Sequence, residues 1–508
     1  MSAPMLPLGT HTVGTLLAEW AADTPDAPFL VHEDEAGTVT TYSYAATLDL
    51  AHRGAAVLES LQVGLGDRFG MVIGNRPEFF ACWFGAALIG AVMVPMNPQS
   101  TVHELAFMLE HSTCAAVIAD ADRADDVRSA TTAPVVSLGA DFDSRGITPS
   151  TVVPAALDPR APLAVLYTSG TTSRPKGVVV THANYLVAGE AIAAHVRMGP
   201  TDRWLVVLPL FHANAQYYST MSALVSGASI AVMHRFSASG WGAQAKRHVA
   251  TLGSLFAAPI RMILAQPFDP ADAPDSLRVT WFAQNLTADQ LDEFERRFGC
   301  PLVQWYGMTE TIAPPVANPL HRRRDDMTIG RPTCTAVRVV DANGDDVGIG
   351  EVGELLVGGV PGVTLMAGYL DDPAATDTAM HDGWLHTGDM VRVEPTGALA
   401  FFDREKDMIK RSGENVAAAE VERVVNEHPA VFESAAIGVP DDIRDEAIKM
   451  FVVLHDGVTA TEADIVEFCR ERMVRFKVPS HVEFVDRLPR TSVGKIRKHV
   501  LRSGGDDR

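Results

Sequence analysis

Hydroxyl side chains, a glycine and a lysine gather in one short stretch of the chain, Leu166–Thr181. The stretch reads Leu-Tyr-Thr-Ser-Gly-Thr-Thr-Ser-Arg-Pro-Lys-Gly-Val-Val-Val-Thr, with apolar residues on both sides. These runs predict two strands with a small loop between them. Glycine lets backbone N–H groups approach an anion, hydroxyls donate further hydrogen bonds and Lys176 supplies charge, so the loop suits phosphate. A solvated hairpin turn remains the alternative, because Ser, Thr and Gly also fill ordinary turns.

The common phosphate loop of nucleotide-binding proteins does not match this stretch. That loop needs G-x-x-x-x-G-K-[ST] at the start of a helix, whereas Lys176 precedes Gly177 and a strand-like valine run follows. A second glycine–lysine pair, Gly494–Lys495, is followed by Ile496 and also fails. A phosphate site here must therefore be of another kind.

Alternating strands and helices must position this loop. Continuous apolar strands that alternate with helices indicate parallel sheets covered on both faces. The first series is expected at Phe69–Ile73, Pro77–Ile89, Ala91–Pro95, Val102–His111 and Ala115–Ala119, and later strands at Trp204–Leu208, Ala228–Met233, Leu252–Ala257, Val279–Ala283 and Leu302–Trp305, with a helix at Ala288–Phe298.

Two changes of pattern divide the rest of the chain. Between Val337 and Leu399, short strands broken by glycine predict a small antiparallel β unit. The charge run Asp403–Asp407 then precedes an α+β segment. We therefore expect an α/β protein with a large domain of parallel βα sheets at 1–403 and a small α+β domain at 404–508. The small domain's elements are expected at Ala418–Glu427, Ser434–Val439, Met450–Leu454 and Glu462–Val474.

Composition excludes several classes of protein. The net charge of -21 argues against a nucleic-acid partner. Five scattered cysteines without metal spacing, and a start at Met1–Thr10 without a signal pattern, predict reduced thiols and a cytoplasmic location. The uncharged run Phe79–Met96 is interrupted by glycine and proline, so we expect a buried helix and strand rather than a membrane span.

Leu166–Thr181 resembles the signature loop of the adenylate-forming superfamily, which includes acyl-CoA synthetases, carrier-protein adenylation domains and luciferases. The resemblance recurs in the expected order over nearly the whole chain. It implies that the small domain is mobile and that ATP, Mg²⁺ and coenzyme A are used. The other matching segments are Trp305–Glu310, Trp384–Asp389, Arg404–Lys406, Lys410–Asn415 and Pro489–Lys495.

The resemblance also implies roles for single residues on the nucleotide side. Tyr306 packs on adenine and is followed by Gly307, Thr309 touches phosphate and Glu310 holds magnesium. Asp389 and Arg404 bind the ribose. The phosphate loop contributes Thr168, Ser169, Gly170, Thr171, Thr172 and Lys176, and the expected catalytic set is Lys495, Glu310, Thr168 and Lys176.

In the small domain the resemblance implies a hinge at Lys406 and contacts with the pantetheine arm of CoA from Lys410, Ser412 and Gly413. Lys495 is the implied catalytic lysine. It serves a reaction in which a carboxylate attacks the α-phosphate of ATP, pyrophosphate leaves, and a thiol then takes the acyl group from the acyl-adenylate. The spacing after Lys495 departs from the family pattern, so no role is implied for Arg497 or Lys498.

Three segments, Thr172–Lys176, Met308–Ile312 and Ile443–Lys449, are most similar to carnitine and crotonobetaine CoA ligases. The acyl pocket is expected to include His212, Asn214 and Tyr217. Asn214 is neutral where that group has an aspartate, which could balance a trimethylammonium group.

We therefore expect a neutral, bulky acid, as in secondary metabolism. The segment Phe282–Leu286 also lacks the small residues that the family commonly has there, so the wall of the site that this segment forms is unusual.

Other readings stay open. They are a stand-alone adenylation enzyme that serves a carrier protein or partner enzyme, a carnitine or crotonobetaine CoA ligase, and a binding protein with a disabled site. The short chain without a fused carrier domain favours free CoA, and the full set of site residues disfavours the disabled site. The oligomeric state is left open.

Overall fold

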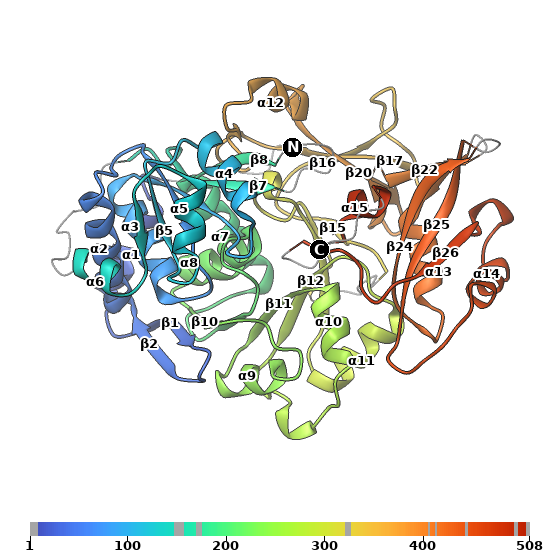
Figure 1. Cartoon of the computed structure of the whole chain (residues 1–508), viewed down its shortest axis with the longest axis horizontal. Coiled ribbons are helices and arrows are strands. Elements are labelled where there is room, and N and C mark those ends of the chain that lie inside the picture. The colour runs from blue at the N-terminus through green and yellow to red at the C-terminus, as the bar shows by residue number, and fades with distance from the viewer. Residues whose placement is uncertain are drawn as a thin grey trace.

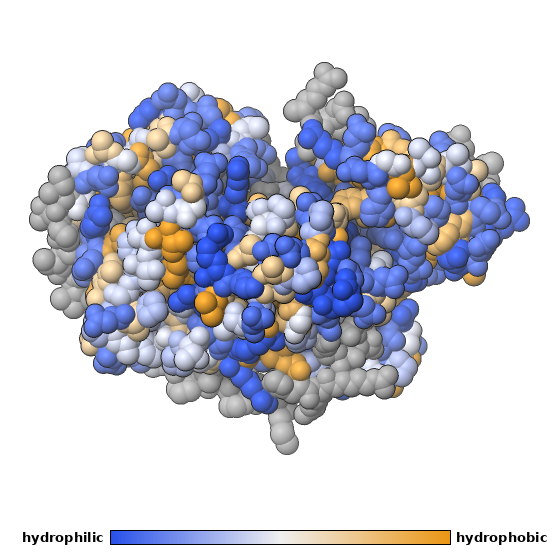
Figure 2. Space-filling view, turned by 90° about the horizontal axis from the view of Figure 1, so that it is seen from below, coloured by the Kyte–Doolittle hydropathy of each residue, from blue (hydrophilic) through white to orange (hydrophobic). Residues whose placement is uncertain are grey.

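The computed structural model of the chain describes residues 9–146, 157–168, 175–320, 327–404, 407–411, 414–441, 445–491 and 496–503. Two large sheets lie side by side in the N-terminal part, and the C-terminal part forms a smaller lobe at the right of Figure 1. The face in Figure 2 shows hydrophobic residues scattered among hydrophilic ones.

The first large sheet carries the candidate phosphate loop. Its strand order is β18-β8-β7-β4-β3-β5-β6, and its pairs from β6 to β7 are parallel. β8 instead runs antiparallel to β7, so both strands meet at the loop. The strands are β3 (Arg68–Val72), β4 (Val92–Pro95), β5 (Ala116–Ala119), β6 (Val135–Ser137), β7 (Pro162–Thr168), β8 (Lys176–Thr181) and β18 (Gly368–Tyr369).

The second large sheet has the strand order β15-β14-β13-β12-β11-β9-β10-β1-β2. The strands from β13 to β1 pair in parallel, so the carboxyl ends of β9, β11, β12 and β13 meet at one edge. The strands are β1 (Pro28–Glu33), β2 (Val39–Ser43), β9 (Arg203–Val206), β10 (Ser229–Met233), β11 (Leu252–Phe256), β12 (Val279–Ala283), β13 (Leu302–Tyr306), β14 (Val316–Ala317) and β15 (Arg331–Pro332).

Helices pack the two sheets into one core. In α3 every residue from Phe79 to Ile89 is buried, because the helix lies between other elements on all sides. A Cβ on Gly54 of α2 would lie 1.9 Å from the carbonyl oxygen of Ala81, so glycine is needed for this close helix contact. The helices of the large domain are α1 (Val13–Asp23), α2 (Tyr44–Ser60), α3 (Pro77–Ile89), α4 (Val102–His111), α5 (Ala124–Ala130), α6 (Ala140–Arg145), α7 (His182–Val196), α8 (Met221–Val225), α9 (Trp241–Arg247), α10 (Ala257–Leu264), α11 (Ala288–Phe298) and α12 (Pro373–Ala379), with the π-helix η1 (Asn214–Thr220) and the short 3-10 helices η2 (Pro270–Asp272) and η3 (Thr309–Thr311).

A five-stranded antiparallel sheet follows, as the glycine-rich pattern predicted. β16 pairs with β17, β17 with β20, and β20 with both β19 and β21. Its strands are β16 (Val337–Val340), β17 (Val352–Gly358), β19 (Met380–His381), β20 (Trp384–Val393) and β21 (Leu399–Arg404).

The C-terminal lobe has its own sheet and its own hydrophobic core. β24 and β25 are its longest strands and pair antiparallel, with β22 and β26 also beside β25. The elements are β22 (Met408–Arg411), β23 (Glu414–Ala417), α13 (Ala418–Asn426), β24 (Val431–Asp441), β25 (Asp445–Leu454), α14 (Glu462–Arg470), η5 (Arg475–Lys477), β26 (His481–Phe484) and α15 (Lys498–Arg502).

The predicted α/β class with a small α+β domain is confirmed, and most predicted elements lie within two residues of the observed ones. Three predictions were wrong in extent: the helix expected to reach Val474 ends at Arg470, β24 begins at Val431 rather than Ser434, and β25 begins at Asp445 rather than Met450. The uncharged run Phe79–Met96 is the buried α3 followed by β4. Among the described residues no helix combines the length and the apolar character that crossing a bilayer requires.

Candidate active site

The two strands that flank the predicted phosphate loop bring its ends together. Thr168, the last residue of β7, lies opposite Lys176, the first of β8. The Thr168 hydroxyl donates to the Lys176 carbonyl over 3.5 Å. Ser169, Gly170, Thr171 and Thr172 lie outside the described residues. The described chain thus places both ends of the loop at one point, at the edge of the first large sheet.

A tyrosine that sequence reasoning missed joins Lys176 to Glu310. Lys176 Nζ lies 4.7 Å from the ring centroid of Tyr369, and the Tyr369 hydroxyl donates to Glu310 Oε1 over 3.0 Å. Burial, followed by the Glu310 charge, raises the pKa of Tyr369, so this hydroxyl stays a donor. Tyr369 reaches the site because β18 pairs with β8. Nothing near Tyr369 in the sequence indicates this long-range pairing.

Glu310 fits the carboxylate ligand of a magnesium ion. It is 5% exposed and lies in η3, directly after the carboxyl end of β13. Within the described ranges no group of three or more His, Cys, Asp or Glu side chains gathers as a metal cluster. Mg²⁺ often takes only one or two protein carboxylates and completes its shell with water and substrate phosphates. The donor set therefore suits a metal that arrives with a nucleotide.

Tyr306 and Asp389 come from different sheets and meet in a buried hydrogen bond. The Tyr306 hydroxyl donates to Asp389 Oδ2 over 2.6 Å. Arg404 lies directly opposite Asp389 in the β20–β21 register. The structure thus brings together the three residues that were expected on the adenine and ribose side. Their roles in nucleotide binding stay predictions.

The turn that carries Asp389 is held by Glu354, a second residue that the sequence did not indicate. Glu354 Oε1 accepts from the backbone N–H of Gly388 over 2.9 Å, and its Oε2 lies 3.0 Å from Nδ1 of His386. Gly388 has φ +66°, a conformation that favours glycine. Glu354 sits where the register of β17 against β20 shifts. It therefore fixes the backbone from which Asp389 projects.

Gly307 and Thr309 lie between this region and the predicted acyl pocket. A Cβ on Gly307 would lie 3.2 Å from the Tyr218 hydroxyl, so the loop after β13 passes close to η1. Thr309 begins the single turn η3 that carries Glu310. The nucleotide-side and acyl-side segments are thus neighbours.

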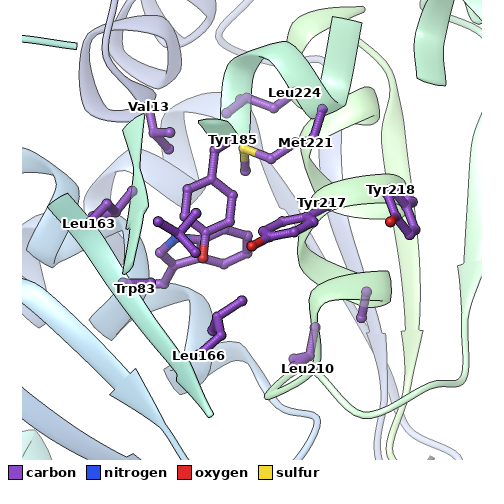
Figure 3. Packing of buried hydrophobic residues seen from close by; sticks show 14 of the residues in the cluster. Val13, Trp83, Leu163, Leu166, Tyr185, Leu210, Tyr217, Tyr218, Met221 and Leu224 are labelled. Atoms are coloured by element: carbon purple, nitrogen blue, oxygen red, sulfur yellow. The ribbon is translucent and has the colours of Figure 1, made fainter. Parts of the chain in front are cut away.

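The predicted acyl pocket includes a π-helical segment, η1, which directly follows His212 and Ala213. π-helical turns are rare and often occur at functional sites. Asn214 Oδ1 accepts from Ser254 Oγ of β11 over 3.0 Å. Tyr217 is fully buried, with its ring between those of Tyr185 and Tyr218 (Figure 3). His212 is partly exposed.

The unusual segment after β12 forms a polar wall at the same edge. Gln284 has φ +77°, and its carbonyl accepts from Gln304 Nε2 over 2.9 Å. The carbonyl of Asn285 accepts from Arg261 Nη2 over 2.7 Å. Burial lowers the pKa of Arg261 to about 10 despite the opposing influence of Glu422 in the small domain. The backbone of this segment thus holds Arg261 of α10, whose charge is also influenced by Glu422 of the small domain.

The catalytic lysine expected in the small domain, Lys495, lies outside the described residues, as do Lys406, Ser412, Gly413 and the side chain of Lys410. Residues on both sides of Lys495 are described. Arg490 and Ile496 form an antiparallel bridge, and the Arg490 guanidinium donates to Glu433 of β24. Burial lowers the pKa of Arg490 to about 10. This ion pair between the partly buried Arg490 and the buried Glu433 anchors the base of the segment that carries Lys495.

Lys498, for which the sequence implied no role, is a structural cation. Lys498 Nζ lies 2.7 Å from Glu422 Oε1. Burial alone would lower the pKa of Lys498, but the nearby charges of Glu422, Asp403 and Asp407 outweigh burial and raise it. Asp407 also pairs with Arg502 over 2.6 Å. We call these five residues the α15 ion cluster.

Comparisons with known proteins identify the family of the chain. The family model of the AMP-binding enzyme matches residues 17–370, and that of the AMP-binding enzyme C-terminal domain matches 420–495. The crotonobetaine/carnitine–CoA ligase of Proteus mirabilis (strain HI4320) is 38% identical over 93% of this chain and 95% of its own.

Among solved structures, ATP-bound MatB from Rhodopseudomonas palustris gives a TM-score of 0.88 at 26% identity, over 98% of this chain and 99% of its own. The apo structure of MatB gives 0.75 at 26% identity, over 97% and 99%. The chain therefore belongs to the AMP-binding enzyme family and is an ATP- and Mg²⁺-dependent acid–thiol ligase that activates a carboxylic acid as its acyl-adenylate and transfers the acyl group to CoA.

Proposed function

We propose that this ligase acts on a neutral, bulky carboxylic acid and that free CoA is its acceptor. The observation that carries the proposal is Asn214. This side chain is 5% exposed, belongs to the segment expected to line the acyl pocket, and has neutral Ser254 as its hydrogen-bond partner. A quaternary ammonium group desolvated beside an amide would lack a compensating charge.

In the first half-reaction the acid's carboxylate attacks the α-phosphorus of ATP. Negative charge then grows on the phosphoryl oxygens, and fixed positive groups lower its energy most when they need no rearrangement. We assign Lys176, Lys495 and the hydroxyls of the loop after Thr168 to these oxygens. Glu310 holds the magnesium ion, which would neutralise phosphate charge when bound.

In the second half-reaction the CoA thiol attacks the acyl carbonyl and AMP leaves. We propose that the small domain, 404–508, turns about Lys406 between the two steps, so that Lys410, Ser412 and Gly413 meet the pantetheine arm. Support for two arrangements comes from MatB, because the chain is more similar to its ATP-bound structure than to its apo structure at equal identity. The arrangement described here is accordingly assigned to adenylate formation.

A quaternary-ammonium acid is the second candidate. The relatives named crotonobetaine/carnitine–CoA ligase favour it. So does a group of aromatic rings beside the site, since the Tyr218 centroid lies 6.0 Å from that of Tyr217 and 4.5 Å from that of Trp305. Aromatic faces attract quaternary ammonium groups by cation–π interaction.

A panel of neutral aromatic, alicyclic and aliphatic acids, together with carnitine and crotonobetaine, tests the proposal. Pyrophosphate release is measured with and without CoA, and the product is identified by mass spectrometry. We expect a neutral acid to give the highest kcat/KM and an acyl-CoA product. Preference for carnitine would favour the second candidate, and acyl-adenylate without thioester would indicate a carrier protein or partner enzyme as acceptor.

A further inference from the structure

Two buried polar groups in η1 lack a hydrogen-bond partner among the residues that the structure describes. Asn214 Nδ2 and the Tyr217 hydroxyl are both inaccessible to water, and neither has a hydrogen-bond partner within the described part of the chain. The two residues belong to the same π-helical segment, three positions apart. Leaving a buried donor unpaired destabilises a folded protein, so such groups are rare unless function requires them.

Two polar neighbours of these groups, Tyr185 and Gln216, do have hydrogen-bond partners. Ser254 Oγ donates to the side-chain oxygen of Asn214, so the amide nitrogen is the side-chain group without a partner. Tyr185, whose ring packs at 5.4 Å against that of Tyr217, donates its hydroxyl to Gln216 Oε1 over 2.5 Å. Gln216 in turn donates to the carbonyl of Leu210 over 2.7 Å. Tyr185 and Gln216 are therefore satisfied while Asn214 Nδ2 and the Tyr217 hydroxyl are not, and the indole N–H of Trp83, toward which the Tyr217 hydroxyl points, also lacks a partner within the described residues.

The position of the two groups connects them to the reaction. Phe211, His212 and Ala213, directly before η1, are partly exposed, so an accessible segment leads to Asn214. Burial raises the pKa of Tyr217 most, and nearby groups that include Glu310 raise it further. The phenol therefore stays protonated and can donate a hydrogen bond. Figure 3 shows its hydroxyl pointing away from Tyr218 and toward Tyr185 and Trp83.

We infer that the acid carries a neutral hydrogen-bond acceptor on its tail, a hydroxyl, carbonyl or ether oxygen, which accepts from Asn214 Nδ2, and that the Tyr217 hydroxyl donates to the same acid. This inference rests on the proposed function and narrows its substrate class. A site built to bind such an oxygen strongly rejects an analogue without that oxygen, because the analogue leaves the buried donors unpaired. Asn214 is thus a specificity-determining residue, and binding of the acid requires side chains around η1 to give way.

Stability without any acid gives the first test. Tyr217→Phe removes a hydroxyl without a partner, so its Tm should equal or exceed that of the wild type, by up to about 2 °C. Tyr185→Phe is the matched control, since it removes a hydroxyl that is bonded to Gln216 and should lower the Tm. An equal loss in both variants would overturn the inference, because the Tyr217 hydroxyl would then have a partner.

Selectivity gives the second test, with 3-hydroxybutanoate against butanoate and 4-hydroxybenzoate against benzoate as matched pairs. On the carbon skeleton that the wild type turns over, the hydroxy acid should have at least a ~100-fold higher kcat/KM. Asn214→Leu should reduce this ratio to below ~5-fold, and Tyr217→Phe should reduce it in part. A wild-type preference for the plain acid, or a ratio that both variants leave unchanged, overturns the inference. Absence of any thioester would instead count against the proposed function, and the stability test does not depend on it.

Discussion

Replacing Asn214 with aspartate should exchange the acids that the enzyme accepts. Ser254 Oγ would still donate to one carboxylate oxygen, as it now donates to the amide over 3.0 Å, but the other oxygen would take the place of Nδ2, which has no described partner. A neutral acid would then meet a buried, half-satisfied charge. A buried, half-satisfied charge costs more free energy than an unpaired neutral donor. The kcat/KM for the neutral acid should therefore fall by at least ~100-fold.

A quaternary-ammonium acid should gain from the same change. At about 5 Å and an effective dielectric constant of about 20, the attraction between the two charges is about 3 kcal/mol, which corresponds to roughly a 100-fold gain. The assay is pyrophosphate release with carnitine and with one neutral cyclic acid, at a pH where the carboxylate is ionised. Ser254→Ala is the control, because it changes the same pocket without adding charge.

The experiment gives four rates, those of carnitine and of the neutral acid with the wild type and with Asn214→Asp. Wild-type enzyme that turns over carnitine best would show that Asn214 does not exclude a quaternary amine. Rates that Asn214→Asp leaves unchanged for both acids would show that residue 214 does not line the pocket.

Three further changes test other parts of the structure. Lys495→Ala should slow adenylate formation by ~100- to 1,000-fold and spare thioester formation from supplied acyl-adenylate, since its charge is needed only at phosphorus; equal loss in both steps would contradict its role. Lys498→Met should destabilise the small domain by about 3 kcal/mol in urea unfolding, because Glu422 keeps a partly buried charge without its cation, and Lys498→Met/Glu422→Gln should recover part of that loss. Burial lowers the pKa of His182 to about 4, below the unfolded value of 6.5. Its contribution to the free energy of unfolding, about 3 kcal/mol, is therefore complete above pH 6.5 and is lost as the pH falls toward 4. His182→Phe should flatten the dependence of stability on pH over this range, and an unchanged slope would refute the assignment.

Local signals predicted most elements of the fold. α11 illustrates why, because Thr287 and Gln290 form a capping box at its start and Gly299 closes it with φ +65°. Its observed ends agree with the prediction, Ala288–Phe298. The ends of β24 were less predictable, because this strand extends to Asp441 only through pairing with β25.

Most of the residues missing from the predicted site act through pairing that is remote in sequence. Tyr369 reaches Glu310 because β18 adds to β8, and Glu354 reaches Gly388 because β17 lies beside β20. Neither residue has a local pattern that distinguishes it from an ordinary strand residue. The π-helical form of η1 is equally unpredictable from the sequence, because no residue type specifies a π-helix.

The α15 ion cluster constrains how this sequence can diverge. Asp403 lies in β21 of the large domain's last sheet, and its Oδ2 also accepts from the backbone N–H of Ala419 at the start of α13 over 3.1 Å. Lys498 and Arg502 lie just beyond the segment that carries Lys495. Loss of one charge leaves its partners unbalanced, so a tolerated substitution needs a second one elsewhere in the cluster. In related chains these positions should therefore change together, and a chimera that joins the first part of one ligase to the α15 of another should inherit mismatched charges at this junction.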